Sequence, residues 1–191
     1  MDLIDMSKIP DGDYKYILHL KDHYSRYSWA RGITSKKAVE VAVCIFDIFT
    51  EVGPPTILQS DNGAQFTAGI IKELMTLWPT VKIIRGRPRH PESQGSVERG
   101  NKEISKKLGA WMDEFSSSDW ILGLKKVIYT MNTTISSATK KSPYEIVYGK
   151  QPNGETAWLD HLYKSSADGI IDEDNLPENI NIQQSDTLQV Y

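Results

Sequence analysis

Apolar residues recur along the first 153 positions of the chain in two different patterns. Short runs rich in aliphatic and aromatic residues, bounded by Gly, Pro, Asp and Ser, are typical of β-strands. Five such runs are expected to be strands: residues 2–6, 14–22, 27–33, 56–59 and 81–84. The second and third runs follow one another closely and are expected to form a hairpin.

Apolar residues at steps of three, four and seven predict helices in the intervening segments. The expected helices are residues 35–51, 68–78, 96–114 and 120–133, followed by a compact element at 139–153. Thr34 or Ser35 is expected to cap the first helix, and Ser118 or Asp119 the fourth.

The same spacing predicts which side of each helix is buried. The first helix is expected to bury Val39, Val43, Phe46 and Phe49; the third, Val97, Ile104, Leu108 and Trp111; and the fourth, Trp120, Leu124, Val127, Ile128 and Met131.

Three strands that precede an alternation of strands and helices indicate an α/β fold. Such an order predicts a mixed sheet with helices packed on its faces. Several common folds share it, so the order by itself assigns no function.

Composition bounds the class of protein. The 191 residues are 39% hydrophobic and 25% charged, as in ordinary globular domains. No apolar run is long enough for a membrane span, and the N-terminus lacks a secretory signal. The single cysteine, Cys44, excludes an internal disulfide framework and fits an intracellular, reducing compartment.

Charge divides the chain in two. Residues 154–191 hold one lysine and eight acidic residues, a formal charge of −7, which leaves residues 1–153 at +4. We expect a core domain at 1–153 and an acidic, largely disordered tail at 154–191. The basic residues of the core concentrate between Arg85 and Lys107, a weak signal for nucleic acid.

Three acidic residues lie where elements of an α/β fold can converge. Asp2 is in the first strand, Asp61 follows the fourth, and Glu98 is near the start of the third long helix. Clustered carboxylates repel one another unless a cation lies among them, and their oxygens select Mg²⁺ or Mn²⁺. Two such ions can promote in-line phosphoryl transfer.

Simpler explanations exist for each acid. Asp61 before Asn62 and Gly63 is a common turn former, and Asp2 could be an ordinary strand-end residue. Glu98 with Lys102 four residues later could be a surface helix pair.

Two sequence blocks carry a resemblance that favours the catalytic explanation. The segments Ser60-Asp-Asn-Gly-Ala-Gln-Phe66 and His90-Pro-Glu-Ser-Gln-Gly-Ser-Val-Glu-Arg99 resemble the catalytic cores of retroviral and gypsy-type retroelement integrases. The resemblance covers about residues 1–152, including the Gly53-Pro-Pro55 and Ser142-Pro-Tyr144 segments. It implies an RNase H-like mixed five-stranded sheet with helices on both faces, in an active transposable element or a host protein domesticated from one.

The resemblance also implies a site with two aspartates and one glutamate. Asp2, Asp61 and Glu98 match the three catalytic metal ligands, with Mg²⁺ or Mn²⁺ in a two-metal site. Asp5 is a rival for the first position and Glu92 for the third.

The resemblance further implies DNA as the substrate. The residues expected to contact nucleic acid are Arg85, Arg87, Arg89, Lys102, Lys106, Gln94 and Asn62. Segment 86–95 is expected to be a mobile loop over the scissile phosphate, and arginines there would neutralise backbone phosphates. A nuclear homo-oligomer that binds DNA and no membrane is implied.

Two alternatives stay open from the sequence. The domain could be a domesticated, catalytically silent module that binds nucleic acid or protein, or an RNase H-type nuclease. No zinc-binding module of paired His and Cys is present, because four His and one Cys lie at unrelated spacings.

Overall fold

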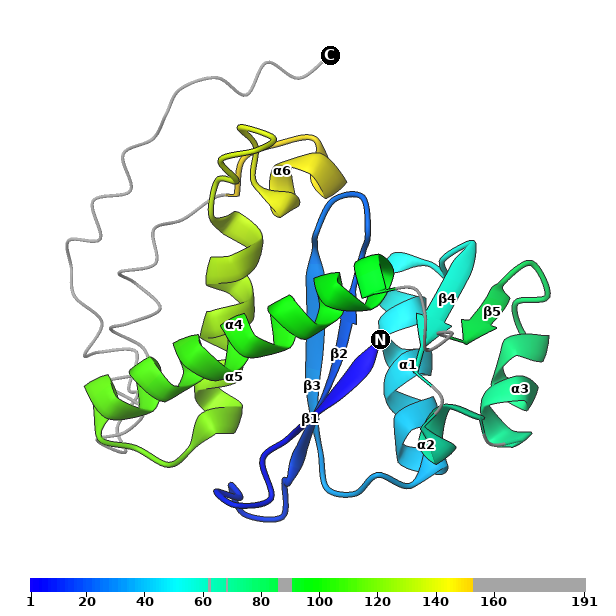
Figure 1. Ribbon diagram of the computed structural model, residues 1–191, viewed down its shortest axis with the longest axis horizontal. Coiled ribbons are helices and arrows are strands. Elements are labelled where there is room, and N and C mark those ends of the chain that lie inside the picture. Colours follow the sequence, from blue (N-terminus) through cyan, green and yellow to red (C-terminus); the bar gives the residue numbers. More distant parts are fainter. Residues whose placement is uncertain (62, 68, 86–90, 153–191) are drawn as a thin grey trace, which may run out of the picture. The chain divides into compact units, whose positions relative to one another are not determined.

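The computed structural model describes residues 1–61, 63–67, 69–85 and 91–152. Within this part, Asp2–Asp5 (β1), Tyr16–Lys21 (β2) and Ser28–Ile33 (β3) form an antiparallel sheet in the order β1-β2-β3. Ile57–Ser60 (β4) and Lys82–Arg85 (β5) pair in parallel. All five predicted strands are therefore confirmed, and so is the hairpin (Figure 1). The predicted tail at 154–191 lies outside the described residues.

The strands form two sheets, not the single five-stranded sheet that was expected. β4 and β5 make a separate two-stranded sheet beside the three-stranded one. One link between them is a hydrogen bond from the N-terminal amine of Met1 to the carbonyl oxygen of Gln59, at 2.6 Å. Among the described residues, β1 and β4 are not paired as neighbouring strands.

Six helices surround the strands in the described residues. They are Ala38–Val52 (α1), Ala64–Thr67 (α2), Gly69–Thr76 (α3), Pro91–Phe115 (α4), Trp120–Thr133 (α5) and Pro143–Tyr148 (α6). The four predicted helices are confirmed; the second corresponds to α3, and the short helix α2 before it was not predicted. Helix α6 lies within the compact element that was expected at 139–153. None of these helices is long and apolar enough to cross a membrane.

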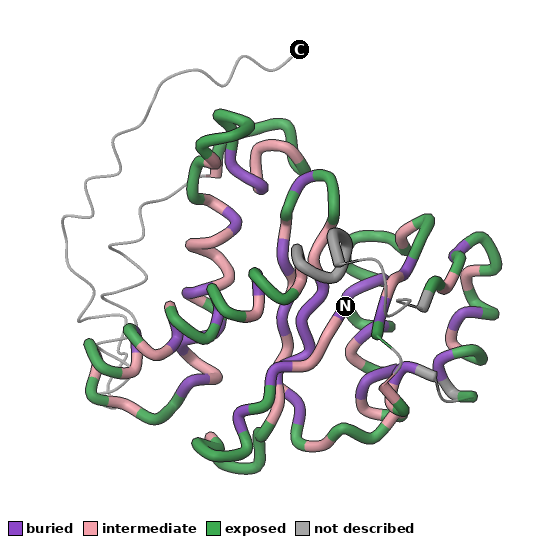
Figure 2. The backbone as a smooth tube through the Cα atoms, in the orientation of Figure 1, coloured by how far each residue is buried: buried purple, intermediate pink, exposed green. Residues whose placement is uncertain are grey.

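Helices cover both faces of the three-stranded sheet (Figure 1). On one face, α1 and α3 enclose an apolar core that includes Leu18, Leu20, Ile45 and Ile71. On the other face, α4 and α5 enclose a second core around Ile17 and others: Ile4, Ile104, Leu108, Trp120, Leu124 and Val127. Strand β2 is thus buried on both faces, as its continuous apolar run allows (Figure 2).

The predicted buried stripe of α1 is largely wrong. Its buried residues are Val41, Ala42, Ile45, Ile48 and Phe49. Val39, Val43 and Phe46 are instead exposed, at 60%, 62% and 43%. Because α1 is apolar on most of its surface, spacing alone could not identify the buried side. In α4 the predicted stripe is confirmed at Ile104, Leu108 and Trp111, but Val97 is only half-buried. In α5 the predicted stripe is confirmed, with Ile128 and Met131 partly buried.

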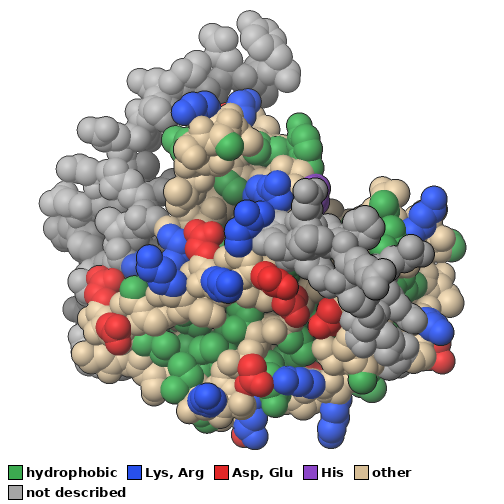
Figure 3. Space-filling view, viewed as in Figure 1, with side chains coloured by type: hydrophobic (Ala, Val, Ile, Leu, Met, Phe, Trp, Pro, Cys, Tyr) green, Lys and Arg blue, Asp and Glu red, His purple; other side chains and the backbone are tan. Residues whose placement is uncertain are grey.

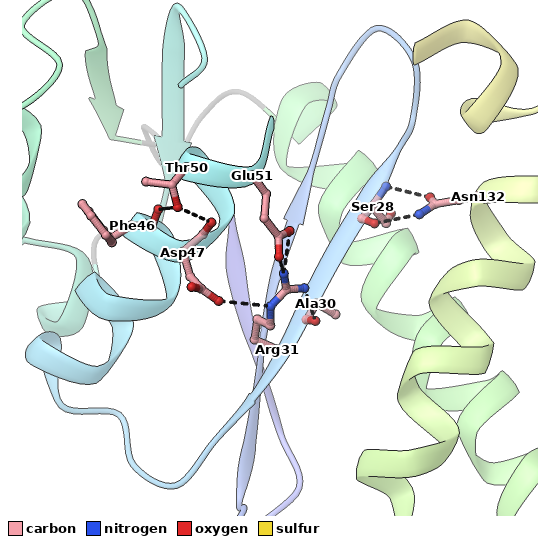
Figure 4. Close-up of polar contacts among 8 residues, drawn as sticks. All are labelled: Ser28, Ala30, Arg31, Phe46, Asp47, Thr50, Glu51 and Asn132. Atoms are coloured by element: carbon pink, nitrogen blue, oxygen red, sulfur yellow. Dashed lines mark hydrogen bonds and ion pairs between the residues drawn. The ribbon is translucent and has the colours of Figure 1, made fainter. Parts of the chain in front are cut away.

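Arg31 of β3 ties α1 to the sheet at the surface. Its Nη2 donates to both carboxylate oxygens of Glu51 at 2.8 Å, and its Nε lies 3.8 Å from Asp47 (Figure 4). The pair is partly exposed, so its contribution to stability is at most about 1 kcal/mol. The contact links β3 to the C-terminal half of α1.

The helix caps differ from those expected. Glu40 reaches back from the first turn of α1 and accepts hydrogen bonds from Thr34 and Ser35, so these residues donate to a helical side chain instead of capping. At α5, Asp119 makes no side-chain cap hydrogen bond. Asp11, from the loop after β1, accepts from the Ile121 amide at 2.8 Å instead. Asp11, which is distant in sequence, thus acts as the N-terminal cap of α5.

We expect Asp11→Ala to lower the free energy of unfolding by about 1 kcal/mol, the usual cost of losing a helix cap. Urea unfolding followed by circular dichroism measures it. Asp13→Ala in the same loop is the matched control, because Asp13 is exposed and should change stability little. Equal stability of the two variants would show that Asp11 is not the cap of α5.

Helix α4 begins at Pro91, five residues before its predicted start at Ser96. Proline suits the first helical position, because its fixed φ matches a helix and its missing N–H is not needed there. Residues 91–95 therefore belong to the helix and not to a loop, and residues 86–90 lie outside the described part. Glu98 consequently lies about two turns into the helix, where the helix dipole has little effect.

Candidate active site

Strand register places two of the predicted acidic residues on one face of the fold. Asp2 pairs with His19, and Ile4, two residues further along β1, packs in the core beneath α4 and α5. Since side chains alternate along a strand, Asp2 faces the same side as Ile4. On β4, Leu58 packs in the opposite core, and Asp61 follows the strand directly.

All three predicted acidic residues line one cavity of about 100 Å³. It is lined by Met1, Asp2, Gln59, Ser60, Asp61, Val97 and Glu98. The acids come from three separate elements: β1, the end of β4 and α4. Figure 1 shows the N-terminus beneath the start of α4, and Figure 3 shows acidic and basic side chains close together over that helix.

Asp2 is the best-anchored of the three acids. Its Oδ1 accepts from the Leu3 amide at 2.8 Å, and its Oδ2 accepts from Asn101 Nδ2 at 2.6 Å. Burial raises the pKa of Asp2, and the nearby Asp61 carboxylate raises it further, while the two hydrogen bonds act in the opposite direction. Each oxygen thus has one fixed donor and retains a lone pair for another ligand.

Asp61 is held by a local turn. Its side chain is exposed, and its Oδ1 accepts from the Gly63 amide at 2.9 Å. A Cβ at position 63 would lie 2.9 Å from that same oxygen and 2.2 Å from Gln65 Nε2. Glycine at this position therefore leaves room for the Asp61 carboxylate. Asp61 can therefore both stabilise this turn and line the cavity.

Glu98 is exposed on α4 and reaches the cavity beside Val97. Within the part of the chain that the structure describes, no ion pair joins Glu98 to Lys102. The surface helix pair considered from the sequence does not form here; Lys107 instead lies 3.9 Å from Glu103.

The two rival acids differ in position. Asp5 is at the opposite end of β1, where its carboxylate accepts from Ser7 and lies 3.2 Å from Lys36 Nζ. Hydrogen bonds from Ser7 lower the pKa of Asp5 to about 2. Asp5 is thus absent from the cavity lining. Glu92 lies in the first turn of α4, and its side chain is outside the described part.

The donor set suits a hard divalent cation in chemistry and charge. Carboxylate oxygens are the preferred ligands of Mg²⁺ and Mn²⁺. The N-terminal amine of Met1 lies in the same cavity; burial lowers its pKa to about 6, while Asp2 and Asp61 favour its charged form. Among the described residues, no group of three His, Cys, Asp or Glu side chains lies close enough together to hold one metal ion. A bound ion would have to draw the carboxylates together.

The residues predicted to bind nucleic acid are described in part. Lys102 and Lys106 are exposed on α4. Arg85 ends β5 and Gln94 lies in α4, but their side chains are outside the described part, as are Asn62, Arg87 and Arg89 entirely.

Asn101 and His19 were not identified from the sequence as site residues. Asn101 lies three positions after Glu98 on the same side of α4 and contacts Asp2 directly. His19 is fully buried, and its Nδ1 is 2.7 Å from Asn101 Oδ1. The available signal was a polar residue inside the apolar run of β2, which requires hydrogen-bond partners when buried.

Comparison with curated proteins shows where the chain has relatives. It is 34% identical over 149 residues to the human KRAB-A domain-containing protein 2, covering 78% of this chain. It is 32% identical over 158 residues to the Gag-Pol polyprotein of feline leukemia virus, again covering 78% of this chain. The matches span only 30% and 9% of the length of these two relatives.

Solved structures show the same architecture. The catalytic core domain of BIV integrase is 26% identical, with a TM-score of 0.58 and coverage of 78% of this chain and 90% of that one. The HTLV-2 integrase catalytic core in complex with magnesium, 18% identical with a TM-score of 0.59, covers 69% of this chain and 92% of that one. The fold is therefore that of RNase H-like integrase cores.

A family model supports the same relationship. Residues 1–91 match the integrase core domain family, a range that contains Asp2 and Asp61. A transposon relative, the Pol polyprotein of transposon 412 from Drosophila melanogaster, is 29% identical over 140 residues. The predicted resemblance is confirmed: residues 1–91 match the integrase core domain family, and the chain is similar to retroviral and transposon Pol polyproteins and to a retroviral integrase catalytic core.

Proposed function

We propose that this domain is a polynucleotidyl transferase core that cleaves and joins DNA phosphodiesters. The observation that carries the proposal is the convergence of Asp2, Asp61 and Glu98 on one cavity from three separate elements. These carboxylates would hold Mg²⁺ or Mn²⁺, which activates the attacking oxygen and stabilises the charge that develops on phosphate.

The chain's own residues would prepare this site. Asn101 and the Leu3 amide orient the Asp2 carboxylate, and Gly63 orients that of Asp61. Lys102 and Lys106, exposed along α4, would hold the DNA backbone beside the cavity. Arg85, Arg87, Arg89, Asn62 and Gln94 would extend this contact.

We also infer that the two sheets act as one five-stranded sheet in the working domain. The hydrogen bond from the Met1 amine to Gln59 supports this inference, because it joins the edge of β1 to β4. Such continuity would hold Asp2 and Asp61 at a fixed separation.

A disintegration assay on branched DNA tests the proposal with the full chain. We expect cleaved and rejoined strands in the presence of Mn²⁺ or Mg²⁺, and none after addition of a chelator. Complete lack of metal-dependent product, with DNA binding retained, would overturn the catalytic proposal. It would favour the second candidate below.

The second candidate is a catalytically silent module that binds DNA or a protein. Two observations favour it: the acids are not close enough to hold one ion as placed, and a relative is a human KRAB-A domain-containing protein. It predicts salt-dependent DNA binding that is indifferent to chelators. For either candidate acting on DNA we propose a nuclear location and a homo-oligomer; the oligomer is supported by two similar structures, a simian T-cell lymphotropic virus intasome and an HTLV-2 integrase core in trimeric form.

Removing the two lysines on α4 should weaken DNA binding independently of sequence. We expect Lys102→Ala/Lys106→Ala to reduce affinity and to lower the slope of log affinity against log salt by about 2, one for each phosphate contact. Fluorescence anisotropy over a salt series measures both. Lys140→Ala/Lys141→Ala, in the exposed loop before α6, is the matched control. An equal effect of the control pair would mean that α4 does not contact DNA.

A further inference from the structure

A continuous line of hydrogen bonds crosses the fold behind Asp2. Ser28 of β3 is 3.2 Å from His19 Nε2, His19 Nδ1 is 2.7 Å from Asn101 Oδ1, and Asn101 Nδ2 donates to Asp2 Oδ2 at 2.6 Å. The line thus passes from β3 through β2 and α4 to β1.

The far end of this line is itself fixed. Asn132 of α5 accepts from the Ser28 amide at 2.8 Å and donates to the Ser28 carbonyl at 2.9 Å, which holds the Ser28 backbone (Figure 4). Ser28 and Asn132 are only 1% and 3% exposed. Buried polar groups of this kind are costly unless paired, and here each has a partner.

The hydrogen-bond donors in the line all point toward Asp2. The Asp2 carboxylate accepts only, so the amide nitrogen of Asn101 must face it, and the amide oxygen must face His19. That oxygen requires a donor, which assigns the proton of the neutral imidazole to Nδ1. His19 Nε2 then accepts from the Ser28 hydroxyl. If Asn101 were rotated by 180°, its oxygen would face the carboxylate without a donor between them.

Close packing of α4 against β2 makes the contact possible. A Cβ on Gly100 would lie 2.8 Å from His19 Cε1, too close for any side chain there without displacement of the imidazole. Burial keeps the imidazole neutral and lowers the pKa of His19 to about 4, so the tautomer persists at neutral pH. Within this arrangement His19 and Ser28 are buried, whereas Asn101 and Asp2 are half-buried.

We propose that His19 is a positioning residue that, through Asn101, holds the Asp2 carboxylate in the orientation needed to bind the divalent ion. This inference rests on the proposed function, since it assigns Asp2 as a metal ligand. Groups that orient a metal ligand from behind contribute about 10- to 100-fold to metal affinity.

Manganese titration of the full chain by calorimetry tests the proposal without an activity assay. We expect His19→Phe, which removes the Nδ1 donor, to weaken Mn²⁺ binding by about tenfold or more. His19→Asn should restore most of the affinity, because its side-chain amide places an N–H donor near the Nδ1 position. Ile17→Val, on the same strand and the same face, is the control for a general loosening of this core.

Imidazole ¹⁵N shifts of the unaltered chain give a second measurement that requires no variant to fold. We expect the Nδ1–H tautomer at neutral pH, whereas the Nε2–H tautomer would overturn the proposal. Unchanged Mn²⁺ affinity in His19→Phe would also overturn it and leave the proposed function intact. Absence of Mn²⁺ binding by the unaltered chain would overturn both.

Discussion

Asp61→Asn is expected to reduce metal-dependent DNA cleavage by about a thousandfold or more. The substitution removes one negative ligand, and a metal ion contributes several kcal/mol to stabilising the transition state. The asparagine oxygen can still accept from the Gly63 amide, so the turn should be retained. Because Asp61 is exposed, the free energy of unfolding should change little.

Initial rates on branched DNA with Mn²⁺ measure this effect. Asp113→Asn is the matched control, since Asp113 is exposed near the other end of α4 and far along the helix from Glu98. A rate within experimental error of the unaltered chain would exclude Asp61 from the chemistry. A loss of folding in the same variant would be seen by circular dichroism and would point to a structural role in the turn.

Acidification is expected to destabilise the domain through His19. Its pKa falls from 6.5 in the unfolded chain to about 4 in the folded domain, because burial penalises the charged imidazole. The neutral form is therefore favoured by folding. The stability that it contributes is complete above pH 6.5 and is lost as the pH falls toward 4, by roughly 3 kcal/mol in total.

Urea unfolding at a series of pH values between 7 and 4 measures this loss. His19→Asn is the informative comparison, because it cannot titrate in this range, and its stability should vary less with pH by about the same amount. The difference between the two stability curves gives the contribution of the His19 imidazole, because the contribution of the carboxylates is common to both. Parallel curves would show that His19 is accessible to protons in the folded state.

The order of strands and helices could be predicted because their apolar periods are distinct. Helices α4 and α5 have clear patterns, and most of their buried residues were identified. The buried side of helix α1 could not be predicted, since the exposed Val39 and Val43 are as apolar as the buried Val41 and Ile45. Only tertiary packing decides between such sides.

The acids of the candidate site could be predicted from local motifs, but their surroundings could not. Asp61 and Glu98 lie in recognisable blocks, whereas the partners of Asp2 come from Asn101 on α4 and, behind it, His19 on β2. Hydrogen bonds between residues 82 or 99 positions apart leave no local pattern. The remote cap from Asp11 to α5 escaped prediction for the same reason.

The pairing of Asp2 with His19 makes the site depend on the register of β1 against β2. β1 has four residues, and Met1 and Leu3 pack in the core on the opposite face from Asp2. A shift by one residue would turn the carboxylate into an apolar core and an apolar side chain into the cavity. Insertions or deletions in the loop between β1 and β2 should therefore affect metal binding more than their distance from the cavity suggests.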